Sequence, residues 1–229
     1  MNILKRIRYR EIIIFLCILL LFRLSPLLQY IPIRLLNWDV SRLSSSQEIV
    51  LLTFSSLCLF VIYFIFYFKS LRKDLNTFKN DIMNNLNTAF KYWIVGLVIM
   101  FVSNIIIVFF NHNMAGNEQS VRQMINVLPF FMLINAGFIA PFNEEIIFRK
   151  SLGDIFKSKW LFVFFSFLLF GGAHVIGNIK TWLDILYIIP YGALGGAFAL
   201  AYRKTDTIIT SIVMHMFHNT LMVSLLIFL

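Results

Sequence analysis

Cysteine and charged residues are scarce in this chain of 229 residues. It has only 2 cysteines, which excludes a disulfide-rich scaffold. Charged residues make up 14%, against about 25% in ordinary soluble domains. Acidic residues are the rarest charged class, 11 against 20 Lys and Arg, and the net charge is +9. The composition therefore excludes a disordered chain and is unlike that of a typical cytosolic enzyme.

Apolar residues are abundant instead. They make up 59% of the chain, 26 of them are Phe, and the mean hydropathy is +0.81. A soluble globule of this size has too little interior for so much apolar surface, so we expect an integral membrane protein built as one all-α, polytopic helix bundle. In such a protein the positive charge indicates topology and not nucleic-acid binding. Cys17 and Cys58 lie in apolar runs, which predicts buried free thiols.

Seven stretches are long enough to cross a bilayer core of about 30 Å, which needs about 20 apolar residues; six to eight spans would fit the pattern. The first begins at Ile12 and must continue past Arg23 to cross, and the fourth passes through Pro141. The predicted spans lie at about 12–33, 49–68, 92–110, 124–156, 160–179, 183–202 and 207–229.

Basic residues divide unequally between the two sides of these spans. By the positive-inside rule, the richer side is the cytoplasm, which places the N-terminus inside and the C-terminus outside. The first span resembles a signal peptide without a cleavage site, so we expect an uncleaved anchor. The small size and the Lys-, Asn- and Ile-rich composition favour a bacterial cell membrane. The expected inner residues are Lys5, Arg6, Arg8, Arg10, Lys69, Arg72, Lys73, Lys79, Lys91, Lys150, Lys157, Lys159, Arg203 and Lys204; the outer ones are Arg34, Arg42, Arg122 and Lys180.

The connector at 69–91 is polar but repeats an apolar residue every three or four positions, which predicts an amphipathic helix. Two interpretations stay open. The helix lies on the cytoplasmic membrane surface, or it extends the second and third spans into the cytoplasm.

Ionisable residues inside apolar segments are concentrated in the second half of the chain. Such residues are costly in a bilayer and usually mark function, although polar pairs also serve as packing contacts between helices. With a rise of 1.5 Å per residue, they lie at one depth, about 15–21 Å from the nearest cytoplasmic turn. Three helically spaced motifs carry them: Glu144-Glu145-x-x-x-Arg149, Phe170-x-x-x-His174 and His215-x-x-x-Asn219.

The first motif predicts a division of labour between its two carboxylates. Glu145 and Arg149 are four residues apart, so they share a helix face and can pair. Glu144 is rotated from Glu145 by about 100°, so its carboxylate points elsewhere in the bundle. His218 is offset from the site face and His112 falls in a loop, so neither is assigned to the site.

The three motifs in this order resemble those of the CPBP intramembrane proteases, which group type 2 CAAX prenyl endopeptidases with bacteriocin-processing and self-immunity proteins of the Abi family. The resemblance covers about 141–219. It divides the expected bundle into an N-terminal membrane region with the amphipathic connector, 1–123, and a catalytic membrane core, 124–229. It implies an intramembrane endopeptidase that hydrolyses a peptide bond in a membrane-associated peptide or protein.

The resemblance also implies a role for each motif residue. Glu144 would act as general base on a water molecule together with His174, and Glu145 and Arg149 would hold the site. An imidazole and an amide N–H are suitable donors to an oxyanion. The implied oxyanion stabilisers are His215 and Asn219.

Metal use is left open by the sequence. A zinc enzyme would use Glu144, His174 and His215 as ligands, since one carboxylate and two imidazoles are common zinc ligands. No His-Glu-x-x-His motif occurs, and Asn219 suits an oxyanion hole better than a zinc site. We therefore favour metal-free glutamate catalysis without a cofactor, with a zinc metalloprotease as the alternative.

Two other functions compete with proteolysis. The chain could be a catalytically silent membrane scaffold or immunity partner of the same family. It could also be a transporter with a proton pathway through Glu144 and His174, although no inverted repeat is visible. The expected partners are the lipid bilayer and a membrane-embedded substrate. Prenylated CAAX proteins, leader peptides and pheromone precursors fit the family, and the compact bacterial composition favours a peptide or small membrane protein.

Overall fold

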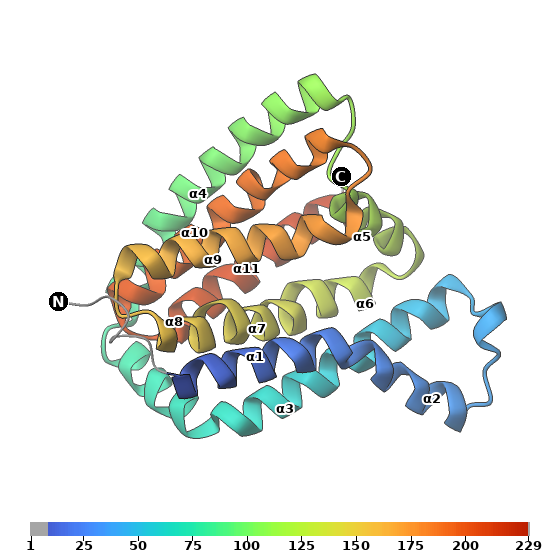
Figure 1. Cartoon of the computed structure of the whole chain (residues 1–229), viewed down its shortest axis with the longest axis horizontal. Coiled ribbons are helices and arrows are strands. Elements are labelled where there is room, and N and C mark those ends of the chain that lie inside the picture. Colours follow the sequence, from blue (N-terminus) through green and yellow to red (C-terminus); the bar gives the residue numbers. More distant parts are fainter. Residues whose placement is uncertain (1–8, 229) are drawn as a thin grey trace.

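The structure is a computed structural model that describes residues 9–228. Within this range the chain contains helices and no strands, which confirms the all-α bundle (Figure 1). Lys5, Arg6 and Arg8 of the predicted basic N-terminus lie outside the described residues. The helices are α1 (Tyr9–Leu24), α2 (Tyr30–Leu35), α3 (Ser45–Asn80), α4 (Ile82–Asn111), α5 (Gly116–Val127), α6 (Pro129–Ile134), α7 (Ala140–Glu145), α8 (Leu152–Ile155), α9 (Lys159–Val175), α10 (Ile188–Thr205) and α11 (Ile208–Phe228).

Seven helical segments of the described chain are long and apolar enough to cross a membrane, as predicted. The first span continues past Arg23, as expected: α1 ends at Leu24, a 3₁₀ turn follows at Ser25–Gln29, and α2 completes the span. The seven candidate spans are Tyr9–Leu35, Ser45–Asn80, Ile82–Asn111, Pro129–Ile155, Lys159–Asn178, Trp182–Thr205 and Ile208–Phe228.

The predicted start of the fourth span, at residue 124, is wrong. Met124 belongs to α5, a separate amphipathic helix that ends at Val127. Leu128 breaks the helix with φ −140° and ψ 73°. The residue before a proline is disfavoured in the α conformation, so Pro129 separates α5 from the span.

The connector at 69–91 is divided between the end of α3 and the start of α4. α3 runs unbroken to Asn80 and α4 begins at Ile82, so a single residue, Asp81, makes the turn. The Asp81 carboxylate accepts a hydrogen bond from the backbone N–H of Asn84 and caps α4. The connector is therefore helical on both sides of Asp81, as its apolar period predicted.

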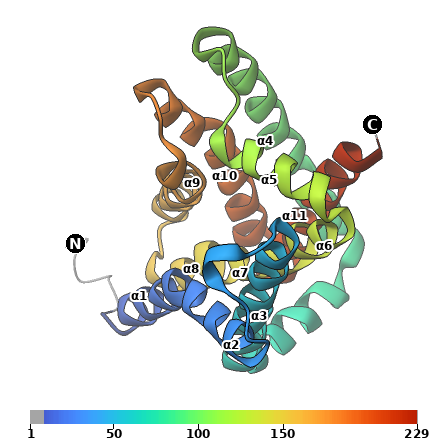
Figure 2. The ribbon, with the colours of Figure 1, turned by 90° about the vertical axis from the view of Figure 1, so that its right-hand side faces the viewer.

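α10 lies in the centre of the C-terminal half, between α9 and α4 (Figures 1 and 2). Glycine allows the close approach to α9. A Cβ at Gly171 would lie 2.5 Å from the Ile188 carbonyl oxygen, and one at Gly192 would lie 2.9 Å from the Phe167 ring. The two cysteines are Cys17 of α1 and Cys58 of α3. Both are free, but Cys17 is exposed and Cys58 is half-buried, so the prediction of buried thiols is wrong.

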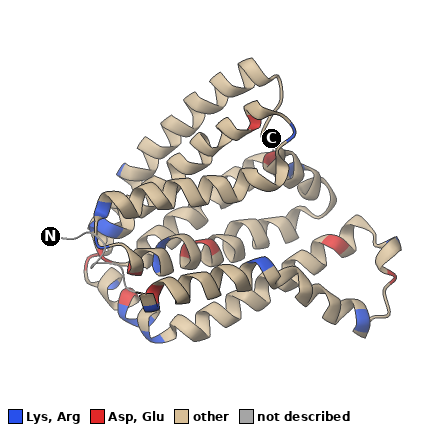
Figure 3. Ribbon diagram, viewed as in Figure 1, with Lys and Arg blue, Asp and Glu red and all other residues tan. Residues whose placement is uncertain are grey.

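Most of the basic residues lie at one end of the bundle, on the left in Figure 3. Most are exposed, but Lys150 is buried and pairs with Asp74 of α3 at 2.7 Å. The Arg203 guanidinium donates to the carbonyls of Gly153 and Phe156, which end α8. The site lies away from this end, in the middle of the same helices.

Candidate active site

Glu144 and Glu145 end α7, which lies between two π-helical turns, Asn135–Ile139 and Ile146–Ser151. A π turn holds one extra residue and so changes the direction in which the following side chains point. Such turns occur often at functional sites. The helical spacing of the motif did not reveal them.

Pro141 explains how the first π turn is bound to α11. The carbonyls of Ala136 and Gly137 lie five and four residues before Pro141, which has no N–H to donate to them. Side chains of α11 supply the missing donors. Asn219 Nδ2 donates to the Ala136 carbonyl at 2.9 Å, and Thr220 Oγ1 donates to the Gly137 carbonyl at 3.5 Å.

Glu145 and Arg149 form a fully buried ion pair, with 3.0 Å between Oε1 and Nη1. Arg149 also donates to the Gly195 carbonyl at 3.2 Å, and its guanidinium lies 4.3 Å from the centre of the Phe170 ring. The same Glu145 oxygen lies 2.8 Å from Nδ1 of His215. Glu145 therefore connects its own helix to α11.

Glu144 faces both motif histidines. Its Oε2 lies 3.6 Å from Nε2 of His215 and 4.0 Å from Nε2 of His174. The backbone carbonyl of Phe170, one turn before His174, accepts a hydrogen bond from Nδ1 of His174 at 2.9 Å. Tyr191 of α10 stacks on the His174 imidazole, with 4.8 Å between the ring centres. The expected division between a paired and an unpaired carboxylate is thus present in the geometry.

The hydrogen-bond partners assign the protons on the two imidazoles. A carbonyl oxygen only accepts, so Nδ1 of His174 carries hydrogen. Glu145 is ion-paired and also accepts, so Nδ1 of His215 carries hydrogen as well. In neutral rings both Nε2 atoms are then acceptors, and both face the Glu144 carboxylate. Three acceptors that converge in this way are a suitable environment for a water molecule, which can donate to two of them.

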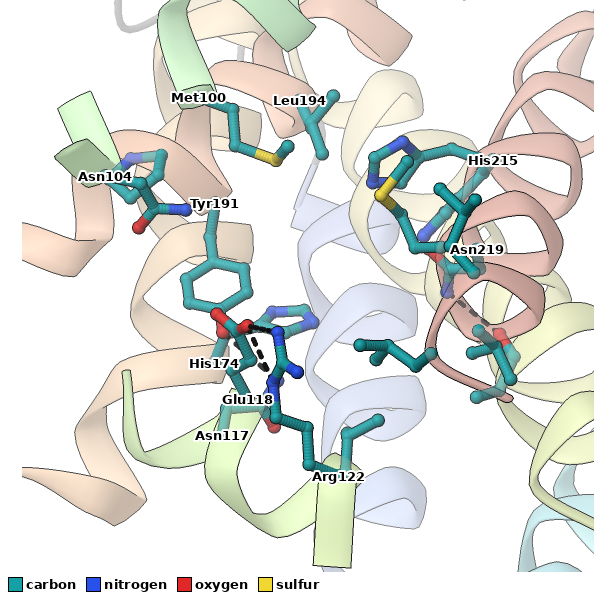
Figure 4. A pocket seen from close by; sticks show the side chains of 18 of the residues that line it. Met100, Asn104, Asn117, Glu118, Arg122, His174, Tyr191, Leu194, His215 and Asn219 are labelled. Carbon is teal, nitrogen blue, oxygen red and sulfur yellow. Dashed lines mark hydrogen bonds and ion pairs between the residues drawn. The ribbon is translucent and has the colours of Figure 1, made fainter. Parts of the chain in front are cut away.

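A cavity of about 410 Å³ lies next to these groups. His174 lines it from α9, while His215 and Asn219 line it from α11 (Figure 4). Glu144 does not line the cavity itself, but it lies next to His174 and His215, which do. The remaining lining is largely apolar and comes from α4, α5, α9, α10, α11 and the first π turn. The arrangement suits a ligand that is mostly apolar and has a polar group near the histidines.

His218 is a residue that the sequence analysis set aside. It lines the cavity, and its Nδ1 accepts a hydrogen bond from the Trp93 indole N–H at 3.2 Å. An indole N–H only donates, so a neutral His218 carries its hydrogen on Nε2. Its spacing of three from His215 was the available signal, because residues three and four apart lie on neighbouring parts of a helix face.

The residues do not fit a zinc site as they stand. Glu144, His174 and His215 are suitable ligand types. Yet among residues 9–228 no group of three or more His, Cys, Asp or Glu side chains is arranged so that it could hold a metal ion.

The family match with known proteins covers the C-terminal half of the chain, which contains the candidate site. Residues 126–221 match the family described as type II CAAX prenyl endopeptidase Rce1-like. A Bacillus subtilis (strain 168) protein named "Putative membrane peptidase YdiL" is 32% identical over 110 residues, which are 47% of this chain and 41% of that protein. "UPF0177 protein YvdC" of Lactococcus lactis subsp. lactis (strain IL1403) is 23% identical over 178 residues, 72% of this chain and 65% of the relative. No solved structure matches.

These matches confirm the resemblance that the three motifs indicated. The matched segment contains all of them and begins just before the fourth span. Together with the seven apolar helices, the matches support an integral membrane protein. The alignments cover less than two thirds of the lengths of the two relatives, so what those proteins do is not transferred to this chain as a whole.

Proposed function

We propose that this chain is an intramembrane endopeptidase that hydrolyses a peptide bond in a membrane-associated peptide or protein. One observation carries the proposal: a single carboxylate, Glu144, faces the Nε2 atoms of His174 and His215 beside an apolar cavity. The family match over residues 126–221 and the relative named as a membrane peptidase support it.

The proposed reaction begins with a water molecule held between Glu144 and His174. Their 4.0 Å separation is too long for a direct hydrogen bond but suits one bridging water. Glu144 takes a proton from this water while the water oxygen attacks the carbonyl carbon of the scissile bond. When the tetrahedral intermediate collapses, the C–N bond breaks and the proton passes from Glu144 to the leaving nitrogen.

His215 and Asn219 are the proposed donors to the oxyanion. Asn219 uses one amide hydrogen on the Ala136 carbonyl and has a second for the substrate. Nε2 of His215 becomes a donor only when the ring is protonated on both nitrogens. Glu145 accepts from Nδ1 and is placed to stabilise that positive charge, with Arg149 fixing its position.

The test is a comparison of membrane fractions from cells that produce the wild type, Glu144→Gln, or the matched control Glu48→Gln, whose side chain is exposed and does not line the cavity. Loss of the general base should slow cleavage by about 10²–10⁴-fold. We expect uncleaved precursors to accumulate, by quantitative proteomics, in Glu144→Gln alone, with equal amounts of the three proteins in the membrane. If Glu144→Gln leaves every precursor processed normally, the chain acts as a scaffold or immunity partner and not as a peptidase.

A further inference from the structure

The cavity lies towards one end of the bundle. Asn117, Glu118 and Arg122 of α5 line it, and α5 is the connection between α4 and α6 on the right in Figure 1. The labelled residues of Figure 4 show this side of the cavity, with Asn117 and Glu118 near His174. No lining residue belongs to the turns that join α3 to α4, α8 to α9, or α10 to α11.

Those three turns are at the basic end of the bundle. The α5 end carries fewer basic residues, namely Arg34, Arg42, Arg122 and Lys180, and two of them form ion pairs: Arg122 with Glu118 at 2.7 Å and Arg42 with Asp39 at 3.6 Å. An excess of Lys and Arg in short connections marks the cytoplasmic side of a membrane protein. The basic residues in or beside the three turns are Lys69, Arg72, Lys73, Lys79, Lys91, Lys157, Lys159, Arg203 and Lys204.

We propose that the cavity opens to the extracytoplasmic face, and that its ligand is an extended, mostly apolar segment of a membrane-anchored peptide presented on that face. Cleavage of this segment rests on the proposed function, but the direction of access does not. A lipid-modified tail on the cytoplasmic side would meet the basic turns and would not reach the histidines from α5.

The walls of the cavity fit this kind of ligand. A volume of about 410 Å³ lies within the range of ligand sites, about 300–1,000 Å³, and holds a short chain segment and not a folded domain. Met100, Leu194 and Met222 provide apolar contacts. Asn104 and Asn117 are uncharged and can bond a peptide backbone, while the charges of Glu118 and Arg122 neutralise each other.

Single cysteines can report which face reaches the cavity. The background carries Cys17→Ala and Cys58→Ala, which removes both native thiols. Asn117→Cys and Asn104→Cys probe the cavity, Gln123→Cys probes the exposed face of α5, and Ser158→Cys probes the basic end. Intact spheroplasts are treated with a small sulfonated maleimide that does not cross membranes. Thiols left unreacted are counted after lysis by a gel-shifting maleimide.

We expect Gln123→Cys and at least one cavity cysteine to react in intact spheroplasts as fully as after lysis, and Ser158→Cys to react only after lysis. Reaction of Ser158→Cys from outside, with Gln123→Cys protected, would reverse the orientation and overturn the proposal. Reaction of Gln123→Cys with both cavity cysteines protected would show that the cavity is closed to this face. Labelling needs no catalysis, so a failure of the proposed peptidase activity would leave these outcomes unchanged.

Discussion

The first and the sixth span differ strongly in how much of each is buried inside the protein. Of the most apolar stretch of Trp182–Thr205, 67% is buried inside the protein, against 11% in Tyr9–Leu35. The buried span is nevertheless the less apolar of the two, because glycine, alanine and a few polar groups pack against other helices there. The first span must satisfy lipid instead, and lipid accepts only apolar surface. Apolarity thus indicates contact with lipid, while small and polar residues indicate contact with protein.

The largest effect is expected from a comparison of two arginines, one in each kind of environment. Arg149→Ala leaves Glu145 without its ion-pair partner in a fully buried position, which should cost about 3–5 kcal/mol. Arg23→Ala removes an exposed side chain from the first span and should change stability little. Protein yield and thermal stability in detergent measure both. Equal behaviour of the two variants would contradict the division between a protein-facing and a lipid-facing region.

A second test concerns the two roles of Asn219. Asn219→Ala should slow cleavage by roughly 10²–10³-fold if the amide stabilises the oxyanion. It should also lower stability by about 0.5–1.5 kcal/mol, because the half-buried Ala136 carbonyl loses its donor. The measurements are turnover of an identified precursor by purified protein and the melting temperature.

The background Pro141→Ala separates these roles. It restores a backbone N–H that can serve the Ala136 or Gly137 carbonyl, so Asn219→Ala should cost less stability there, while the loss of rate should be the same. If Pro141→Ala rescues the rate as well, Asn219 acts only by holding the π turn.

The third test concerns packing between α9 and α10. Gly171→Ala places a methyl group 2.5 Å from the Ile188 carbonyl oxygen and should destabilise by about 1–3 kcal/mol. Gly172→Ala, one residue along, meets its nearest neighbour at 3.4 Å, an ordinary contact, and is the matched control. Melting temperatures compare them. A stable Gly171→Ala would show that the two helices can move apart without cost.

The smallest expected effect is that of chelators. In the metal-free proposal, strong chelators leave the activity of purified protein unchanged. One tightly bound zinc per chain, lost together with activity and restored with it, would instead establish the zinc alternative for Glu144, His174 and His215.

Apolar run length was sufficient to predict the seven spans, because the bilayer imposes a minimum length on every helix that crosses it. The pairing of Glu145 with Arg149 followed from helical spacing alone. The start of the fourth span was missed although Pro129 signalled it, since the apolar pattern continues across the break at Leu128. The cavity could not be predicted, because α5 and the spans that line it are far apart in sequence and meet only through tertiary packing.

The π turns and the role of His218 were also missed. A π turn depends on how neighbouring helices compete for backbone groups, and Pro141 indicates only that some carbonyl lacks a donor. The partner of His218, Trp93, lies 125 residues away in α4. No local pattern connects them.

The ion pairs of the fourth span have a consequence for the biogenesis of this protein. Arg149 follows Glu145 by one turn of the same helix, so their charges neutralise as soon as that helix forms. Lys150 finds its partner in Asp74, which is synthesised 76 residues earlier. Each cation of this segment therefore has an anion within reach before the next span leaves the ribosome, which lowers the cost of placing charge in lipid. His215 arrives with the last described helix, so the fourth span can enter the bilayer before the site is complete.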